Sequence, residues 1–347
     1  MSTLITVLTA LLVFGLLIFI HEFGHYIFAR IFKVKINEFS IGMGPKLLYY
    51  DSKKTGIRYS LSMFPIGGFV AMEGENEEAS DPNSFDKKPA WQRFIITAAG
   101  ATVNIIAGFL IMIILSTMVP IGNTTVGEFV VSEEFDVSSS DSGLQIGDKI
   151  IKVGKKRVVY YDELSYEIMR QGTRPIDLTV IRDGKTQVIE NVVFPGMSQD
   201  GQSFGSMDFR IYRVDKDFGT VMNYSFRKSF LIVRMCWESI YDLITGRYTV
   251  AAISGPVGIS SAIGDAAKAG IASLLHIAAL ISINLGVMNL LPIPALDGGR
   301  LLTLIIEMIT RKKLPPKVEG IINTVGLAAL LLLSVVIMVK DVVGLIF

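Results

Sequence analysis

The chain has 347 residues, of which half are apolar and 19% are charged, and its formal net charge is +1. Soluble domains contain about 25% charged residues, so this composition indicates a protein that contacts lipid. The small net charge, with no block of one sign, argues against nucleic acid as the main partner. A lone cysteine, Cys236, excludes an intramolecular disulfide framework.

The first apolar stretch, residues 4–31, is longer than the roughly 20 residues that cross a bilayer. No Lys or Arg precedes it, and it runs into His21-Glu-Phe-Gly-His25 where a signal peptide would have a small-residue cleavage site. We therefore expect this stretch to remain in the mature protein as a membrane-spanning helix.

The motif inside this stretch places His21 and His25 four residues apart, on one face of a helix, so both imidazoles can approach one ion. Glu22 lies beside them and can take a proton from metal-bound water. Ionisable side chains inside a span cost about 2.5–3.5 kcal/mol each and need a partner. The motif therefore predicts a metal site, and the alternative is a polar cluster that ends the helix at the interface.

A strand is expected after the first span, because apolar and polar residues alternate over 57–63. The next residues, 64–70, stay apolar. An exposed sheet edge here, close to the first span, could accept an added substrate strand.

The second span is expected at residues 94–119, and the segment from 124 to 195 then has the pattern of a small α/β domain. Its expected elements are a strand at 126–131, a helix capped by Asp162 that runs to Gln171, and two strands at 176–181 and 186–193. Asp183-Gly184 between the last two strands is a strong hairpin signal.

The phrase Ser-Gly-Leu-Gln-Ile-Gly-Asp-Lys-Ile-Ile, residues 142–151, resembles the signature of bacterial PDZ domains. Such a domain has a groove that can take an extended peptide. The alternative is a PDZ fold without an open groove that acts as a steric plug.

Residues 218–244 have apolar side chains at helical spacing, interrupted by charged ones, which predicts an amphipathic helix. Trp237 and Tyr241 would suit the headgroup level of a membrane surface. The same periodicity also fits a helix packed on the PDZ-like domain.

The third and fourth spans are expected at residues 272–291 and 321–339. The apolar run 301–309 between them is too short to cross the bilayer, so a re-entrant or interfacial helix is expected there. Lys and Arg gather in the links between spans one and two and between spans three and four. These links should be cytoplasmic, with both termini and the segment 120–270 outside.

A catalytic zinc takes three protein ligands and leaves a position for water. The remaining histidine, His276, lies near the outer end of the third span, whereas Asp297 follows that span in Asn-Leu-Leu-Pro-Ile-Pro-Ala-Leu-Asp-Gly-Gly. Its prolines break the helix and its glycines allow close backbone approach. Spans one and three both run inward, so Asp297 and the histidine pair should meet in the cytoplasmic half of the membrane.

The two motifs, in this order and setting, resemble the site-2 protease family of intramembrane zinc metalloproteases, and more narrowly its bacterial regulator-of-sigma-E protease branch. Further matches are residues 65–75, 88–93 and 255–259. The resemblance implies that Zn²⁺ is bound by His21, His25 and Asp297, that Glu22 is the general base and that Asn289 holds the substrate strand. The chain departs from the family in three ways. It has Ala99-Gly100-Ala101 where the family usually has Ala-Gly-Pro. It has one PDZ-like domain, whereas the regulator-of-sigma-E protease has two, and it is shorter than many members of the family.

The expected fold is a bundle of four transmembrane helices with a membrane-associated β-hairpin and an inserted extracytoplasmic PDZ-like domain. The expected parts are spans one and two (1–119), the PDZ-like domain (120–198), a linker with the amphipathic helix (199–270) and spans three and four (271–347).

The expected function is cleavage of single-span transmembrane segments in a bacterial plasma membrane, with anti-sigma factors or remnant signal peptides as the substrates that the family suggests. Two alternatives remain: a membrane-anchored zinc protease of soluble or surface substrates, and a non-catalytic PDZ scaffold. A transporter is disfavoured, because the spans show no repeat symmetry.

Overall fold

The computed structural model describes residues 3–75, 79–130, 137–199, 202–247 and 255–346. The chain divides into two compact units. The helical unit comprises residues 1–112 and 232–347, and the sheet unit comprises residues 113–231.

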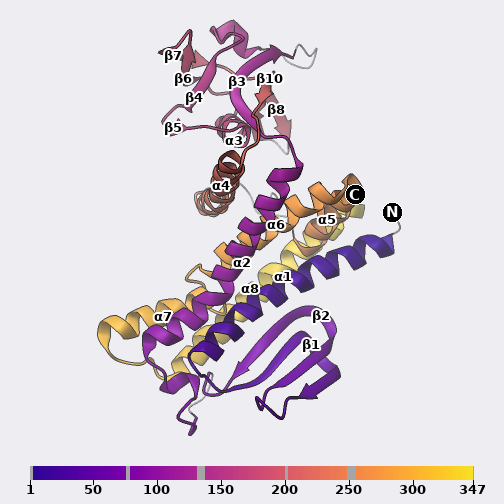
Figure 1. Ribbon diagram of the computed structural model, residues 1–347, viewed down its shortest axis with the longest axis vertical. Coiled ribbons are helices and arrows are strands. Elements are labelled where there is room, and N and C mark those ends of the chain that lie inside the picture. Colours follow the sequence, from indigo (N-terminus) through magenta and orange to yellow (C-terminus); the bar gives the residue numbers. More distant parts are fainter. Residues whose placement is uncertain (1–2, 76–78, 131–136, 200–201, 248–254, 347) are drawn as a thin grey trace. The chain divides into compact units, whose positions relative to one another are not determined.

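Four described helices are long and apolar enough to cross a membrane (Figure 1): α1 (Thr3–Ile31), α2 (Ala90–Met118), α6 (Ile271–Asn289) and α8 (Pro316–Ile346). They confirm the four spans expected from hydropathy, although α2 begins four residues before the predicted start at residue 94. Many of their apolar side chains are exposed, which is the pattern expected of helices whose surroundings are lipid.

Two shorter helices complete the helical unit. The 14 residues of α7 (Asp297–Thr310) cover about 21 Å, too little to cross a bilayer, as predicted for the run 301–309. The second, α5 (Pro256–Ala269), was not predicted from the sequence. Its first turn is held by Asp341 of α8, whose carboxylate accepts hydrogen bonds from the backbone N–H groups of Gly255 and Gly258 at 2.9 and 3.0 Å.

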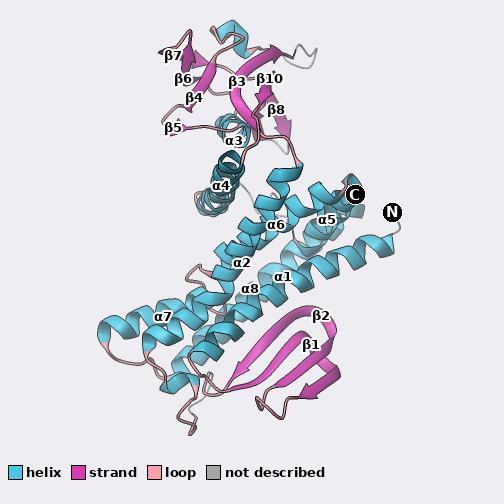
Figure 2. Ribbon diagram, viewed as in Figure 1, coloured by secondary structure: helices cyan, strands magenta, loops and turns pink. Residues whose placement is uncertain are grey.

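Two long bent strands, β1 (Ile36–Asp51) and β2 (Arg58–Met72), form an antiparallel sheet beside α1 (Figure 2). Each strand bends back on the other, so its two halves form two separate rows of the sheet. Residues 36–41 of β1 pair with 58–61 on one side and with 68–72 on the other. Residues 58–62 of β2 pair in addition with 46–51 of β1. The order of rows is therefore 46–51, 58–62, 36–41, 68–72. The predicted strand 57–63 lies inside this sheet, and the edges are the rows 46–51 and 68–72.

One face of this sheet packs on α1, where Phe39 contacts Tyr26 and the hydroxyls of Tyr26 and Tyr59 lie 2.8 Å apart. The far end of the sheet instead carries apolar side chains that are each more than half exposed: Met43, Leu47, Leu48, Tyr49, Tyr50, Met63 and Phe64. Soluble proteins rarely expose a contiguous patch of this kind.

The sheet unit contains an antiparallel sheet with the strand order β10-β3-β4-β6-β7, and β5 pairs with β4. The strands are β3 (Gly122–Phe129), β4 (Lys149–Val153), β5 (Lys156–Arg157), β6 (Ile176–Arg182), β7 (Lys185–Val192) and β10 (Phe209–Arg213). A separate hairpin joins β8 (Gly196–Gln199) to β9 (Gln202–Gly205). Helix α3 (Tyr161–Gln171) packs on this sheet through Leu164 and Ile168. Single 3-10 turns occur at Phe85–Lys87 and Ser139–Ser142.

The hairpin prediction is confirmed, since β6 and β7 pair directly and both turn residues, Asp183 and Gly184, have positive φ, as a type I′ turn requires. Strand β3 begins four residues before the predicted strand 126–131, whose last residue lies outside the described ranges. Strand β10 falls within the range that the sequence assigned to the linker, 199–270, and pairs with β3.

The prediction that Asp162 caps α3 is wrong, because the helix begins at Tyr161 and Asp162 already lies in its first turn. The carboxylate that serves the helix start is Glu163, which accepts a hydrogen bond from the backbone N–H of Val159 at 2.7 Å. Asp162 instead accepts hydrogen bonds from Tyr224 and Lys228.

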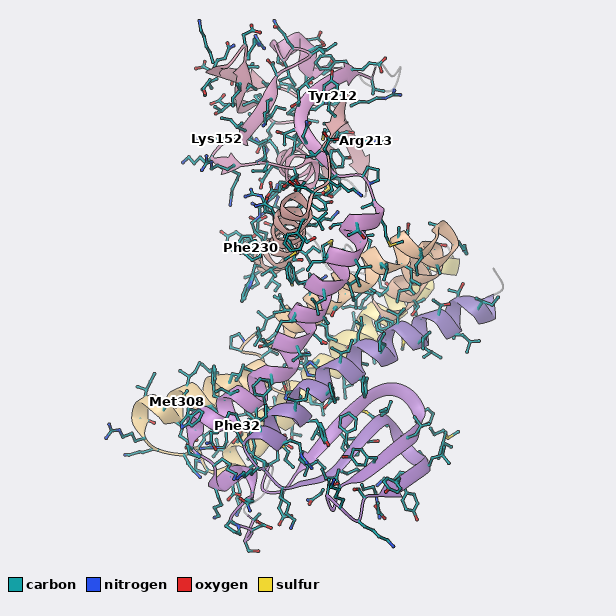
Figure 3. The ribbon with its side chains drawn as sticks, in the orientation of Figure 1. Phe32, Lys152, Tyr212, Arg213, Phe230 and Met308 are labelled. Carbon is teal, nitrogen blue, oxygen red and sulfur yellow. The ribbon has the colours of Figure 1, made fainter. Side chains whose placement is uncertain are left out.

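Those last two residues belong to α4 (Phe218–Ile244), the predicted amphipathic helix. Its first half packs on α3 of the sheet unit, as one of the two alternatives for this helix expected. Another stripe of the helix exposes large apolar side chains, one of which is labelled in Figure 3: Phe226, Phe230, Trp237, Tyr241 and Ile244.

Candidate metal centre

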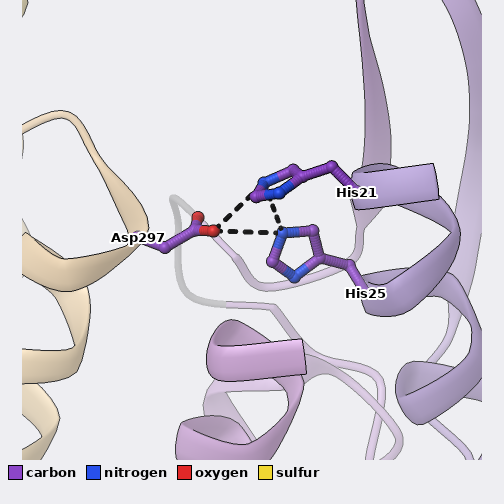
Figure 4. A group of neighbouring side chains, drawn as sticks. All are labelled: His21, His25 and Asp297. Carbon is purple, nitrogen blue, oxygen red and sulfur yellow. Dashed lines mark hydrogen bonds and ion pairs between the residues drawn. The ribbon is translucent and has the colours of Figure 1, made fainter. Parts of the chain in front are cut away.

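Three side chains that lie far apart in the sequence converge in the helical unit (Figure 4). His21 and His25 project from one face of α1, and Asp297 is the first residue of α7. Asp297 Oδ2 lies 3.2 Å from His21 Nε2 and 3.3 Å from His25 Nε2. The two Nε2 atoms are themselves 3.3 Å apart, so the three donor atoms form a nearly equilateral triangle.

This triangle fits a zinc ion. Bonds of about 2.0–2.1 Å to a tetrahedral ion hold any two ligands roughly 3.3–3.4 Å apart, which matches all three separations. Asp297 Oδ2 is also buried, and apart from the two histidine nitrogens it has no hydrogen-bond partner among the described residues. Burying a carboxylate oxygen is costly unless it is paired, and a cation at the centre of the triangle would pair with it. No other His, Cys, Asp or Glu side chains in the described ranges form such a group.

The ring of His25 is oriented by the main chain of α2. Its Nδ1 lies 2.8 Å from the carbonyl oxygen of Ile96. A carbonyl only accepts, so Nδ1 is the donor. In the neutral ring Nε2 then has the lone pair, and this nitrogen faces the triangle. Metal-binding histidines commonly have such a partner on the second nitrogen.

The two helices come close enough for this contact because small residues face each other. A Cβ atom on Gly24 of α1 would lie only 2.7 Å from the carbonyl oxygen of Ala99 on α2. Ala101 stands where the family pattern noted in the sequence has proline, and α2 continues without interruption through this region. The departure from the family pattern therefore leaves the close contact between α1 and α2 intact.

Asp297 is positioned by the turn between α6 and α7. The turn contains Pro292 and Pro294, and Ala295 adopts a positive φ of 71°. The two glycines after the aspartate allow the turn to close. A Cβ atom on Gly299 would lie 2.6 Å from the carbonyl oxygen of Ile293, and a Cβ atom on Gly298 would collide with the carbonyl oxygen of Leu291.

The environment of the Asp297 carboxyl favours its ionised form. Burial would raise the pKa of this group, but the contacts with His21 and His25 outweigh burial and hold the pKa below its usual range. The carboxylate also lies in the first turn of α7, where the helix dipole favours negative charge. An anionic oxygen is the form that binds a cation.

Glu22 follows the first histidine and is half-buried. The sheet edge reaches this residue, since a Cβ atom on Gly68 would lie 3.2 Å from Glu22 Cγ. Asn289 is the last residue of α6 and is half-buried, eight positions before Asp297. His276, on the same helix, is not part of the triangle.

Arg300, which lies one turn after Asp297 on α7, was not predicted as a site residue. It donates hydrogen bonds to the side chain and main chain of Glu75, at 2.5 and 2.8 Å, and lies 3.6 Å from Glu319 of α8. It also lines a cavity of about 330 Å³ that reaches Asp297. Only the fold brings these three charges together, so no local pattern could have revealed them.

Comparisons with known proteins agree with this chemistry. Residues 9–333 match the family described as Peptidase family M50. A protein of Clostridium acetobutylicum named as a zinc metalloprotease is 34% identical, and the match covers 97% of each chain. A Fusobacterium nucleatum protein with the same kind of name is 32% identical over 97% of this chain and 98% of its own.

The regulator of sigma-W protease RasP of Bacillus subtilis is 27% identical, over 97% of this chain and 98% of its own length. The family match covers far more than half of the chain, and these relatives align along nearly all of it. The chain therefore belongs to peptidase family M50, the site-2 protease family, and is a zinc metalloprotease with four helices able to span a membrane.

Proposed function

We propose that this protein is an intramembrane protease that hydrolyses peptide bonds within transmembrane segments of other membrane proteins. His21, His25 and Asp297 are its zinc ligands. The observation that carries the proposal is the triangle of donor atoms, two of which belong to a helix long and apolar enough to cross a bilayer. A hydrolytic site on a helix that spans the bilayer would meet its substrate in the membrane.

Zinc, when bound, would polarise the scissile carbonyl and make a water molecule more acidic. The protein's own acid–base group is Glu22, which takes the proton of the attacking water and later delivers it to the leaving amine. Its neighbours include His21, His25 and Asp297, with which it interacts electrostatically. The cavity that reaches Asp297 would admit the water.

A transmembrane helix hides its carbonyl groups in internal hydrogen bonds, so the substrate must unwind before attack. The sheet edge formed by residues 68–72 is suited to hold the unwound segment, since its outer side has no partner strand among the described residues and it passes beside Glu22. From the sequence, residues 57–70 were predicted for this role. Residues 58–62 are paired on both sides, so the row 68–72, which extends two residues beyond that range, is the part that we propose. Asn289, the last residue of α6, would also hold the substrate strand.

The exposed apolar end of the β1–β2 sheet would lie in the lipid, and Lys and Arg residues indicate the orientation. They concentrate in the links from α1 to α2 and from α6 to α8, which would face the cytoplasm. Both termini and the sheet unit would then be extracytoplasmic. The sheet unit would act as a PDZ-like domain that either binds substrates or excludes them by size. The proposed parts of the chain are residues 1–119, 120–198, 199–270 and 271–347.

The substrate class is proposed from a relative. The Bacillus subtilis protein is named as the regulator of sigma-W protease, so anti-sigma factors with one span are candidates for this chain. Remnant signal peptides, which the family resemblance suggests, are the second candidate class. The setting would be a bacterial plasma membrane.

The test uses the purified full-length protein in lipid vesicles, with a single-span substrate and, separately, the soluble loop cut from that substrate. Wild-type protein should cleave the spanning substrate and leave the soluble loop intact, and Glu22→Gln should retain zinc while losing cleavage. Equal cleavage of the soluble loop would favour a surface protease. Cleavage that survives in Glu22→Gln would refute the assignment of the base.

A further inference from the structure

Beside His21, a polar side chain lies deep between α1, α2 and α6. Asn104 of α2 is fully buried, and its carboxamide nitrogen lies 3.4 Å from His21 Nδ1. Its carboxamide oxygen is also buried and has no hydrogen-bond partner among the described residues. A buried amide in a membrane-spanning helix is costly unless it is used, so this residue requires an explanation.

We propose that Asn104 is a positioning residue for the metal centre. Its side-chain oxygen accepts a hydrogen bond from the Nδ1–H of His21 and so directs Nε2 toward Asp297. This inference rests on the proposed role of His21 as a zinc ligand.

The chemistry of the His21 imidazole decides which atom of Asn104 must face it. A neutral ring has one N–H group and one nitrogen lone pair. If the lone pair of Nε2 faces a metal ion, Nδ1 carries the hydrogen, and its neighbour has to be an acceptor. A carboxamide nitrogen in that place would set two donors against each other.

A half-turn of the Asn104 carboxamide resolves the conflict, because it exchanges the nitrogen and the oxygen without moving the main chain. The oxygen that lacks a partner then receives the Nδ1–H of His21. The ring is fixed in the form that offers Nε2 to the metal, as carboxylate or carbonyl partners do for other metal-binding histidines.

The main chain around Asn104 is held firmly enough for this role. Ser282 of α6, itself fully buried, donates a hydrogen bond to the carbonyl oxygen of Asn104 at 2.8 Å. Nearby, a Cβ on Gly286 would lie 2.6 Å from the carbonyl oxygen of Ala101, so α6 and α2 are in close contact.

Both imidazoles are thus held by α2, in two different ways. His25 uses the main-chain carbonyl of Ile96, which no substitution removes, whereas His21 uses a side chain. The orientation of His21 is therefore open to a mutational test.

The test measures zinc affinity of the full-length protein in detergent by competition with a chelator. Asn104→Leu and Asn104→Ala remove the acceptor, and affinity should fall roughly 10–100-fold. Asn104→Asp keeps an acceptor and should remain close to wild type. Asn284→Leu is the matched control, because it removes a second amide whose buried oxygen also lacks a hydrogen-bond partner, from α6; it should not change zinc affinity.

The visible spectrum of the cobalt-substituted protein gives a readout that a purely structural role would not move. It should change in the Leu and Ala variants and not in Asn284→Leu. Unchanged zinc affinity in both Asn104→Leu and Asn104→Ala would overturn the inference, and so would an equal loss in Asn104→Asp, which would assign the residue to packing. His21→Ala separates this inference from the proposed function. If His21→Ala binds zinc like wild type, the assignment of His21 as a ligand fails. If His21→Ala loses zinc while the Asn104 variants keep it, only the role of Asn104 fails.

Discussion

The imidazole of His25 lies directly against Gly100 of α2, with no room for a methyl group between them. A Cβ atom built on Gly100 would approach the ring carbons Cε1 and Cδ2 to 2.7 and 2.8 Å, and Nε2 more closely still. Such contacts essentially do not occur between real atoms, so any side chain here must displace the ring or separate the helices.

Gly100→Ala should therefore weaken zinc binding even though the residue contributes no ligand. Moving the ring shifts Nε2 out of the donor triangle, and disturbances of this kind lower metal affinity by roughly 10–100-fold. Chelator competition measures the effect. Gly320→Ala, on α8 with open space around it, is the control and should bind zinc normally. Normal zinc affinity in Gly100→Ala would mean that the helices separate without cost.

A second prediction concerns the stability of the sheet unit. The fully buried carboxylate of Asp148 receives two hydrogen bonds from Arg182, at 2.6 and 2.7 Å, and another from the backbone N–H of Gln145 at 2.9 Å. Asp148→Asn leaves the guanidinium without its charge partner. Because the Arg182 side chain is partly exposed to water, the cost should be about 1–3 kcal/mol, less than for a fully buried pair.

Hydrogen exchange of the β4 and β6 amides in the full-length protein would show this loss as reduced protection. The matched control is Glu128→Gln, which breaks the exposed pair of Glu128 with Arg210 and should change protection little. Equal protection in Asp148→Asn and wild type would contradict the prediction, because it would show that the asparagine and water satisfy Arg182 as well as the carboxylate does.

A third prediction is a pH dependence of the β1–β2 sheet. Burial tends to raise the pKa of Glu38, but hydrogen bonds from Lys46 and Ser60 outweigh it and hold the pKa below its usual value. A lowered pKa in the folded state means that the ionised group stabilises the fold above its unfolded-state pKa. This contribution disappears as the pH falls through the lower, folded-state pKa.

The rate of proteolysis within β1 and β2 should therefore rise on acidification below about pH 4.5, with an acid-tolerant protease as the probe. Glu38→Gln has no charge to lose, so its rate should already be higher at neutral pH and change less with acid. If wild type and Glu38→Gln respond identically to pH, another group controls the opening of the sheet.

Much of the fold was predictable from hydropathy and turn chemistry. The spans, the short helix after Asp297 and the β6–β7 hairpin each depend on a local pattern, such as an apolar run or the pair Asp183-Gly184. Strand β1 was missed because Gly42 and Gly44, both with positive φ, bend it and interrupt the alternation of polar and apolar residues. The four-row register depends on how two bent strands fold back, which no local pattern records.

The candidate site was predictable as far as its residues carry chemistry of their own. The structure brings together the two histidines and the aspartate that the order of spans had placed in the same half of the membrane. The roles of Gly100 and Asn104 were not predictable, because each depends on which face of α2 meets α1. A glycine and an asparagine in an apolar helix have many ordinary explanations until that contact is known.

The central claim is that His21, His25 and Asp297 together hold one zinc ion. Zinc content and affinity of purified wild-type, Asp297→Ala and Glu22→Gln proteins test it most directly, by metal analysis after exposure to a weak chelator. Wild type and Glu22→Gln should keep about one zinc per chain, and Asp297→Ala should lose it. Retention of zinc by Asp297→Ala at wild-type affinity would contradict the account.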